Sequence, residues 1–332
     1  MRAMTFALAS LCVIGFAGAT NAEPIKIRNS WVAPVTNWAS ILLEKKDLAK
    51  HLGQSYVMEP VRFGGTPPMI TALANNELEI SNLAYSTLGI AIENAGLSDL
   101  RIVADEFQDG VAGYYSQEYM VLKDSPIQKI EDLQGKVVAT NAAGSAVDVA
   151  MKAMLHKHGL EPNRDYTVIE APFPAMKAML AEHKVDIIPA VVPFSYDPEL
   201  RNMARDLFVQ KDAIGITDMI VWTARKPFID KNRPALVDFF EDTLIITRWY
   251  LDPKNHAEAM EIAGRVTKRP PQAFDWLFTN KDCYHDPDML PNLAALQKNV
   301  DLTQELGFVK GKVDVKAYAD LSMIQEAAKR LK

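Results

Sequence analysis

The stretch IEDLQGKVVATNAAGSAVDVAMKAMLHKHG, residues 130–159, contains a strand, a loop and a helix in that order. Residues 136–139 are mostly apolar and are predicted to form a strand. The loop 141–146 is built of small residues, which allow a ligand to approach the backbone closely. The helical pattern of 145–158 ends at Gly159, a residue that favours helix termination. This order is typical of an α/β protein.

Similar strand and helix units follow one another along the first two thirds of the chain. Further strands are predicted at 25–28, 56–63, 79–83, 100–104, 119–123, 166–170 and 186–189. Further helices are predicted at 39–52, after the Gly-Gly-Thr turn at 64–66, at 86–94 and at 175–182. The alternation predicts a largely parallel, layered α/β sheet. Beyond Pro227 the chain is predicted to be mainly helical, at 234–251, 256–266, 271–278, 291–305 and 315–331.

One segment of the chain occurs twice in related form. LANNELEI at 73–80 is repeated as LAEHKVDI at 180–187, and each copy runs from the end of a helix directly into a strand. The repeat indicates two similarly built lobes. A chance similarity between two helix-to-strand joints is the alternative.

The composition excludes several classes of protein. A length of 332 residues allows about two domains. Lys and Arg total 36 against 42 Asp and Glu, so there is no basic excess to bind nucleic acid. Two cysteines and six scattered histidines provide neither a disulfide framework nor a clustered zinc site. We therefore expect no cofactor, no metal and no nucleic-acid partner.

The N-terminus has the pattern of a secretory signal peptide. Arg2 precedes an apolar run at 3–16, and small residues follow at 17–22. The run is about 14 residues long, whereas a membrane-spanning helix needs ~20. We predict cleavage after Ala22, with Ala19 as the other candidate, and a periplasmic mature protein that retains Cys283 as a free thiol. A buried N-terminal helix is the alternative.

With this signal peptide, three segments carry a family resemblance: 73–91, 127–148 and 179–193. They resemble the type II periplasmic solute-binding proteins of ABC importers, in the branch for nitrate, sulfonate, taurine and thiamine-pyrimidine precursors. The resemblance implies a two-lobed α/β fold with a helical C-terminal section and a solute cleft between the lobes. By analogy, residues 23–112 and 216–332 form lobe 1, and residues 113–215 form lobe 2. It also implies an ABC permease as partner, and we expect a monomer.

Candidate solute contacts lie in the loops that follow the strands, because ligands of open α/β sheets bind there. Ser145 can cap a helix or donate to an anion, and a plain helix cap is the alternative reading of its loop. Aromatic candidates can stack on a planar solute, and core packing is the alternative for each of them, more so for the phenylalanines than for the tryptophans. The full set is Trp31, Thr36, Asn37, Trp38, Gly65, Thr66, Tyr85, Ser86, Tyr115, Asn141, Gly144, Ser145, Phe173 and Phe194.

The resemblance and these loops predict a protein that binds a small organic solute and is not an enzyme. A sulfonate, a carboxylate or a related anion, with or without an aromatic ring, is the expected solute. No arginine falls in a strand-to-helix loop, which favours an aromatic carboxylate or a pyrimidine-like compound over a sulfonate or nitrate. A secreted enzyme on the same fold, acting on a small aromatic or pyrimidine-like compound, is the first alternative. A solute sensor for a membrane receptor is the second.

Overall fold

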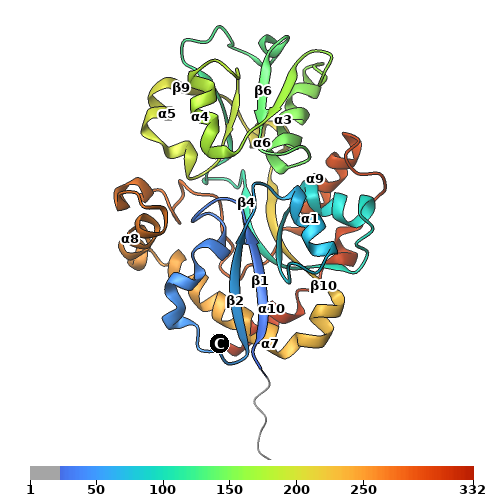
Figure 1. The fold of residues 1–332 in the computed structure, drawn as a ribbon, viewed down its shortest axis with the longest axis vertical. Coiled ribbons are helices and arrows are strands. Elements are labelled where there is room, and N and C mark those ends of the chain that lie inside the picture. The colour runs from blue at the N-terminus through green and yellow to red at the C-terminus, as the bar shows by residue number, and fades with distance from the viewer. Residues whose placement is uncertain (1–22) are drawn as a thin grey trace, which may run out of the picture.

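The computed structural model describes residues 23–332, so the predicted signal peptide lies outside the described residues. Two lobes are stacked along the long axis of the molecule (Figure 1). The larger one, lobe 1, contains β1–β4, β10 and the long C-terminal helices, and the smaller one, lobe 2, contains β5–β9. Within residues 23–332, no helix is both long and apolar enough to cross a bilayer.

The strands of lobe 1 form a mixed sheet. The first two strands are parallel, and a parallel bridge between Asn29 and Ile80 connects them to the start of the third. The last strand, β10, lies antiparallel between β3 and β4. The strands are β1 (Ile25–Trp31), β2 (Tyr56–Arg62), β3 (Ser81–Ala84), β4 (Leu100–Asp109) and β10 (Thr217–Arg225).

Lobe 2 repeats this arrangement. Its parallel pair is β6 and β7, a parallel bridge between Val138 and Ile187 leads into β8, and β5 lies antiparallel between β8 and β9. The strands are β5 (Glu118–Leu122), β6 (Val137–Thr140), β7 (Thr167–Glu170), β8 (Ile188–Ala190) and β9 (Ala204–Val209). The prediction of a largely parallel sheet is confirmed for four strands of each lobe, which run in the same direction, and is wrong for β10 and β5, which insert in the opposite direction.

The two copies of the repeated segment occupy matching positions in the two lobes. α1 (Pro67–Ala74) and α4 (Phe173–Ala181) each precede the third strand of their sheet. Each helix is followed by a residue with positive φ, Asn76 at 55° and His183 at 54°. The two copies therefore form matching helix-to-strand joints in the two lobes.

Two carboxylates complete this match. Glu79 Oε2 accepts a hydrogen bond from the N–H of Arg28 at 2.8 Å, at the first strand of lobe 1. Asp186 Oδ2 accepts from the N–H of Val137 at 2.8 Å, at the corresponding strand of lobe 2. The repeat therefore conserves a contact that fixes the entry into the third strand.

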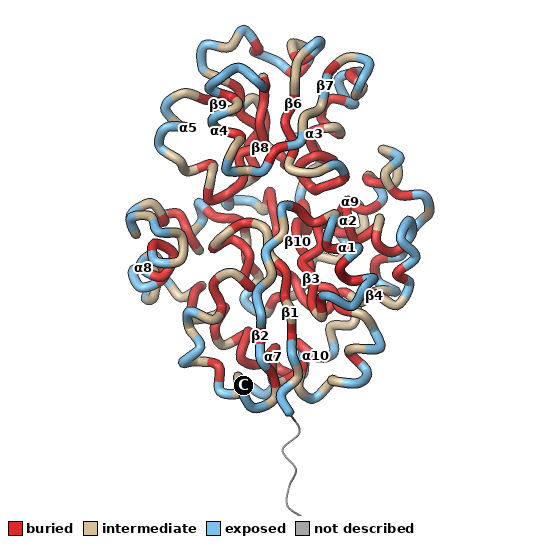
Figure 2. Tube along the Cα trace, in the orientation of Figure 1, coloured by how far each residue is buried: buried red, intermediate tan, exposed pale blue. Residues whose placement is uncertain are grey.

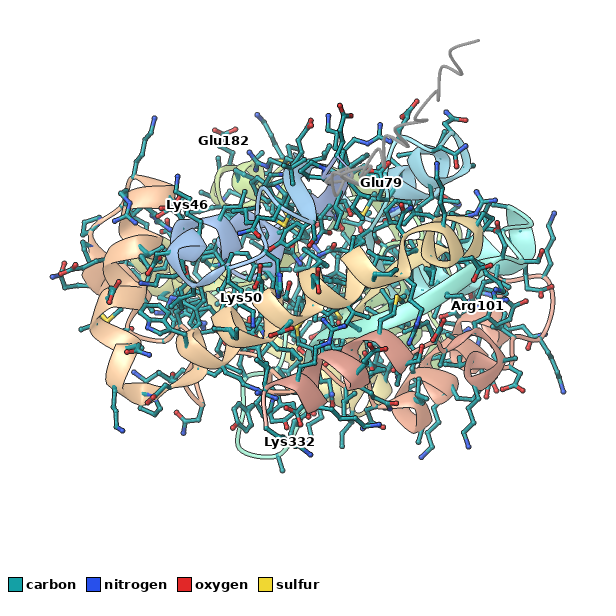
Figure 3. All side chains as sticks on the ribbon, turned by 90° about the horizontal axis from the view of Figure 1, so that it is seen from below. Lys46, Lys50, Glu79, Arg101, Glu182 and Lys332 are labelled. Atoms are coloured by element: carbon teal, nitrogen blue, oxygen red, sulfur yellow. The ribbon has the colours of Figure 1, made fainter. Side chains whose placement is uncertain are left out.

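The remaining helices cover the sheets and complete the C-terminal section. Those of the lobes are α2 (Tyr85–Gly89), α3 (Ala146–Lys157), α5 (Pro198–Met203) and α6 (Gln210–Ile214). Those of the C-terminal section are α7 (Lys226–Leu251), α8 (His256–Thr267), α9 (Leu293–Glu305) and α10 (Ser322–Arg330). The strands β3, β4, β5, β8 and β10 are mostly buried, whereas β2 and β7 are partly exposed (Figure 2). Figure 3 shows charged side chains on this outer surface, including Lys46, Glu79 and Glu182.

Three predicted helices differ from the structure. Residues 39–52 form only two 3₁₀ segments, Trp38–Ser40 and Leu42–Leu48, and Lys45 departs from helical dihedrals at φ −113° and ψ 35°. Residues 271–278 contain one 3₁₀ turn, Pro271–Phe274. The predicted helix at 315–331 is split into Val315–Tyr318 and α10, since Asp320 turns the chain by accepting from the N–H of Ser322.

Candidate functional site

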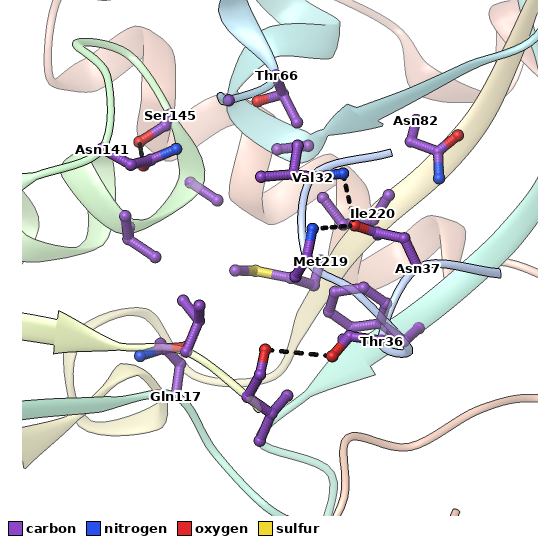
Figure 4. Close-up of a pocket in the computed structure, with 18 of the residues that line it drawn as sticks. Val32, Thr36, Asn37, Thr66, Asn82, Gln117, Asn141, Ser145, Met219 and Ile220 are labelled. Carbon is purple, nitrogen blue, oxygen red and sulfur yellow. Dashed lines mark hydrogen bonds between the residues drawn. The ribbon is translucent and has the colours of Figure 1, made fainter. Parts of the chain in front are cut away.

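A cavity lies between the two lobes, with about 640 Å³ of empty volume including the part open to solvent (Figure 4). Its walls come from the loop after β1, the ends of β4 and β10, the start of α3 and the loop after β8. Seven of the sequence candidates line it: Thr36, Asn37, Gly65, Thr66, Asn141, Ser145 and Phe173.

The two tryptophan candidates and Phe194 lie outside this cavity. Trp38 is 1% exposed and stacks on Phe278 at a centroid distance of 5.1 Å, so it packs in the core. Trp31 lies under the guanidinium of Arg62, which is 5.2 Å from the ring centroid. Phe194 lines a groove next to the cavity, together with Arg62 and Phe173.

Four other candidates make structural contacts instead of facing the cavity. The hydroxyl groups of Tyr85 and Ser86 donate across the lobes to the carbonyls of Ala146 and Gly144, each at 2.9 Å, and Gly144 has φ 76°. These two contacts hold the start of α3 against lobe 1. The Tyr115 hydroxyl donates within lobe 2, to the carbonyl of Ala190 at the end of β8, at 2.9 Å.

The lobes also meet directly at the cavity wall. Asn141 Nδ2 donates to the carbonyl oxygen of Gly64 at 3.1 Å, and Thr36 Oγ1 donates to the carbonyl oxygen of Val192 at 3.1 Å. A Cβ on Gly65 would lie 2.8 Å from Asn141 Nδ2, closer than side chains approach one another. A glycine at this position therefore permits the lobes to close over the cavity.

A buried carboxylate fixes the lobe 1 wall. Glu106 Oε2 accepts from Asn37 Nδ2 at 2.7 Å and from Asn82 Nδ2 at 2.5 Å, and Oε1 accepts from the N–H of Trp38 at 2.7 Å. Burial is the main influence on this carboxyl, and it raises the pKa of Glu106 to about 7 against the opposing effect of its donors. Asn37 Oδ1 in turn accepts from the N–H groups of Val32 and Ala33, which fixes the loop.

Sequence reasoning missed several residues of the cavity, among them Asn82, Asp109, Gln117, Met219 and Cys283. Asp109 ends β4, and its carboxylate accepts from Ser116 Oγ at 2.7 Å and from the N–H of Gln117 at 2.6 Å. Burial raises the pKa of Asp109 to about 6. Met219 lies on β10, a strand that the sequence analysis did not assign. The run TDMIVWTAR at 217–225 is rich in β-branched and aromatic residues, which is the signal that predicts a strand there.

Residues 20–264 match the family model described as the NMT1-like family. The chain belongs to the NMT1-like family. No curated protein matches its sequence significantly.

Solved structures share the fold of this NMT1-like protein. The alkanesulfonate-binding protein SsuA from Xanthomonas axonopodis pv. citri, bound to MOPS, has a TM-score of 0.70 at 18% identity, covering 90% of this chain and 99% of that one. The periplasmic nitrate-binding protein NrtA from Synechocystis PCC 6803 has a TM-score of 0.71 at 14% identity, covering 93% and 90%. The desulfurization enzyme DSZB has a TM-score of 0.65 at 14% identity, covering 93% and 100%. These likenesses establish a two-lobed fold of the periplasmic binding-protein kind.

Cys283 of this NMT1-like protein lies in the cavity wall, next to a segment in which Tyr284 pairs with Gln108. Its side chain is buried, and burial, followed by the charges of Asp282 and Asp109, raises the pKa of the thiol well above its ordinary value. A thiol in this environment stays protonated near neutral pH, whereas nucleophilic cysteines need a lowered pKa.

One group in the described part of the chain has the side-chain types of a metal site. His51, Asp238 and Glu241 place ligand atoms within 4.8 Å of one another, outside the cavity lining. Glu241 already pairs with Lys50, and Asp238 pairs with Arg330 at 2.8 Å. These cations neutralise the carboxylates that a metal ion would need.

Proposed function

We propose that the mature protein is the periplasmic solute-binding component of an ABC importer. It holds a small organic solute in the cavity between its lobes and delivers that solute to a membrane permease. The observation that carries this proposal is a cavity walled by both lobes and closed by hydrogen bonds across them, such as that from Asn141 to Gly64. A solute held by both lobes of such a cavity favours their closed arrangement, so binding is coupled to a change of shape.

The connections between the lobes support this motion. β4 leaves lobe 1 through Gly110 and Gly113, which have φ of 72° and 87°, and the chain returns through Gly215 at 75°. Glycines absorb such backbone rotations without a steric penalty. We place the lobe boundaries at these crossings, with 23–112 and 216–332 in lobe 1 and 113–215 in lobe 2. The protein acts as a monomer after removal of residues 1–22.

An enzymatic role on the same fold is the second candidate, favoured by the position of Cys283 in the cavity. The raised pKa of this thiol argues against nucleophilic chemistry. Conversion of a bound compound that is lost in Cys283→Ser would establish the enzyme instead.

Thermal unfolding of the mature protein with a panel of small organic solutes tests the binding role. A ligand that binds only the folded state raises the melting temperature by mass action. We expect one class of solute to raise it and to be recovered chemically unchanged. Stabilisation by no solute, or recovery of a product, would contradict the proposal.

A further inference from the structure

We propose that the cavity selects a solute that carries an N–H donor group, neutral or positively charged, on an apolar body, and that it rejects oxyanions. This inference rests on the proposed solute-binding function and specifies its substrate class. It departs from the sulfonate or carboxylate expected from the sequence.

Most polar side chains of the lining already direct a donor at the protein. Glu106 receives one N–H of Asn37 and one of Asn82, and the Gly64 carbonyl receives one N–H of Asn141. Three more side chains do the same: Gln117 Nε2 donates to the Glu118 carbonyl at 2.8 Å, Ser145 Oγ to Asn141 Oδ1 at 2.7 Å and Thr36 Oγ1 to the Val192 carbonyl at 3.1 Å. Apart from the Thr66 hydroxyl and the second hydrogen of each amide, an oxyanion would compete for side-chain donors that are in use.

Acceptors, in contrast, remain available. Asn82 Oδ1 is buried and has no hydrogen-bond partner within the described chain. Asp109, 1% exposed, adds a carboxylate to the lining. Thr66 Oγ1 is likewise buried without a partner among the described residues, and a hydroxyl can accept as well as donate. Buried acceptors without partners are costly, so a solute N–H placed among them is stabilising.

The charge of the lining agrees with its hydrogen bonding. Among the described residues that line the cavity there is no Lys, Arg or His, while Asp109 is acidic. Lys211 acts on the Asp109 carboxyl through its charge but is not part of the lining. Arg62 lies at the adjoining outer groove, where it covers Trp31.

Two of the helices that begin at the cavity, α1 and α3, are poorly suited to anions. α1 has Pro67 and Pro68 in its first turn, and proline has no N–H to offer. α3 carries Asp148 in its first turn, and that carboxylate accepts from the N–H of Gly144 at 2.8 Å. A negative charge at this position opposes the positive potential of the helix N-terminus.

The rest of the lining is apolar and accepts a hydrocarbon or aromatic body. Its members include Val32, Phe107, Val147, Val191, Val192, Met219 and Ile220. Together, an apolar chamber with an acidic, acceptor-rich wall matches an amine, an amidine or a primary amide on a compact carbon skeleton.

A matched series of probes tests this inference on the purified mature protein. Benzylamine supplies a charged N–H donor, benzamide a neutral one, and benzoate and benzenesulfonate supply oxyanions on the same ring. The same four groups on a butyl chain repeat the comparison with a smaller body. We expect the compounds with an N–H donor to bind at least about tenfold more tightly than the oxyanions. Thermal shift and calorimetry measure the difference.

Two variants refine the result. Asp109→Asn is expected to weaken binding of the ammonium compounds about tenfold, because the substitution removes only the charge. Its affinity for the neutral amides is expected to change by less than about threefold. Asp124→Asn, an exposed aspartate outside the lining, is the matched control and leaves both affinities unchanged. The order of affinities of the wild-type protein for these compounds tests the inference even if Asp109→Asn fails to fold. Tighter binding of the oxyanions overturns the substrate class and leaves the solute-binding function intact, whereas binding of none of these compounds overturns both.

Discussion

Asn82 Nδ2 donates to Glu106 Oε2 at 2.5 Å, which joins β3 to β4 beneath the cavity. The same carboxylate holds Asn37 and the backbone of Trp38. One buried acidic group thus orients two cavity amides, and it leaves Asn82 Oδ1 without a partner within the described chain. Stability and recognition therefore depend on the same carboxyl.

The first prediction concerns pH. The pKa values of Glu106 and Asp109 are raised by burial to about 7 and about 6, so the folded state holds their protons more tightly than the unfolded state. The stability that they contribute is present below about pH 4 and is lost as the pH rises through 6 and 7. Urea unfolding is expected to give a lower free energy of unfolding at pH 8 than at pH 5. In Glu106→Gln this difference shrinks, whereas in Glu182→Gln, at an exposed position, it is unchanged. A larger difference in Glu106→Gln would contradict the assignment.

The second prediction concerns closure of the lobes. Gly65→Ala places a Cβ 2.8 Å from Asn141 Nδ2 and 3.2 Å from Ala142 Cβ, whereas Gly64→Ala meets nothing within 4 Å. Gly65→Ala is expected to weaken solute binding about tenfold with little change in melting temperature of the ligand-free protein. Gly64→Ala is the matched control. Equal affinities of the two variants for the bound solute would exclude this contact as a determinant of closure.

The third prediction separates binding from stability at two threonines. Thr66 Oγ1 has no partner within the described chain, whereas Thr87 Oγ1 donates to the Ala84 carbonyl at 3.0 Å. Thr66→Val is expected to weaken solute binding without destabilising the fold. Thr87→Val is expected to destabilise the fold by about 1 kcal/mol with unchanged affinity. Calorimetry and urea unfolding of both variants check the pair, and the reverse pattern would remove Thr66 from the site.

The fourth prediction concerns the two tryptophans. Trp38→Ala opens a core position that is 1% exposed and is expected to cost about 3–5 kcal/mol of stability. Trp31→Ala is expected to cost far less, because the ring of Trp31 is only partly buried, under Arg62. Comparable melting temperatures for the two variants would contradict these placements.

The sequence predicted the parts of the cavity that follow from local patterns. Asn141, Ser145, Gly65 and Thr66 lie between a strand and a helix that are adjacent in the chain, so their place at the end of the strand follows from their neighbours. The repeat at 73–80 and 180–187 likewise predicted matching joints. Trp38 follows the same kind of strand, but whether a loop aromatic faces the cleft or the core depends on distant partners such as Phe278.

Other cavity residues depend on pairing between distant segments. Met219 reaches the wall because β10 inserts between β3 and β4, over 100 residues away in sequence. Cys283 lies in the cavity wall because its neighbour Tyr284 pairs with Gln108. Asn82 is oriented by Glu106, a buried acid inside an otherwise ordinary strand. No local pattern encodes these contacts, since each depends on the tertiary packing of the sheet.

Native mass spectrometry of the mature protein with a stabilising solute, followed by denaturation of the same sample, distinguishes binding from catalysis. We expect one solute per chain, held without a covalent bond and released with its mass unchanged. A covalent adduct on Cys283, or release of a compound with a different mass, would contradict a protein that only binds and delivers its solute.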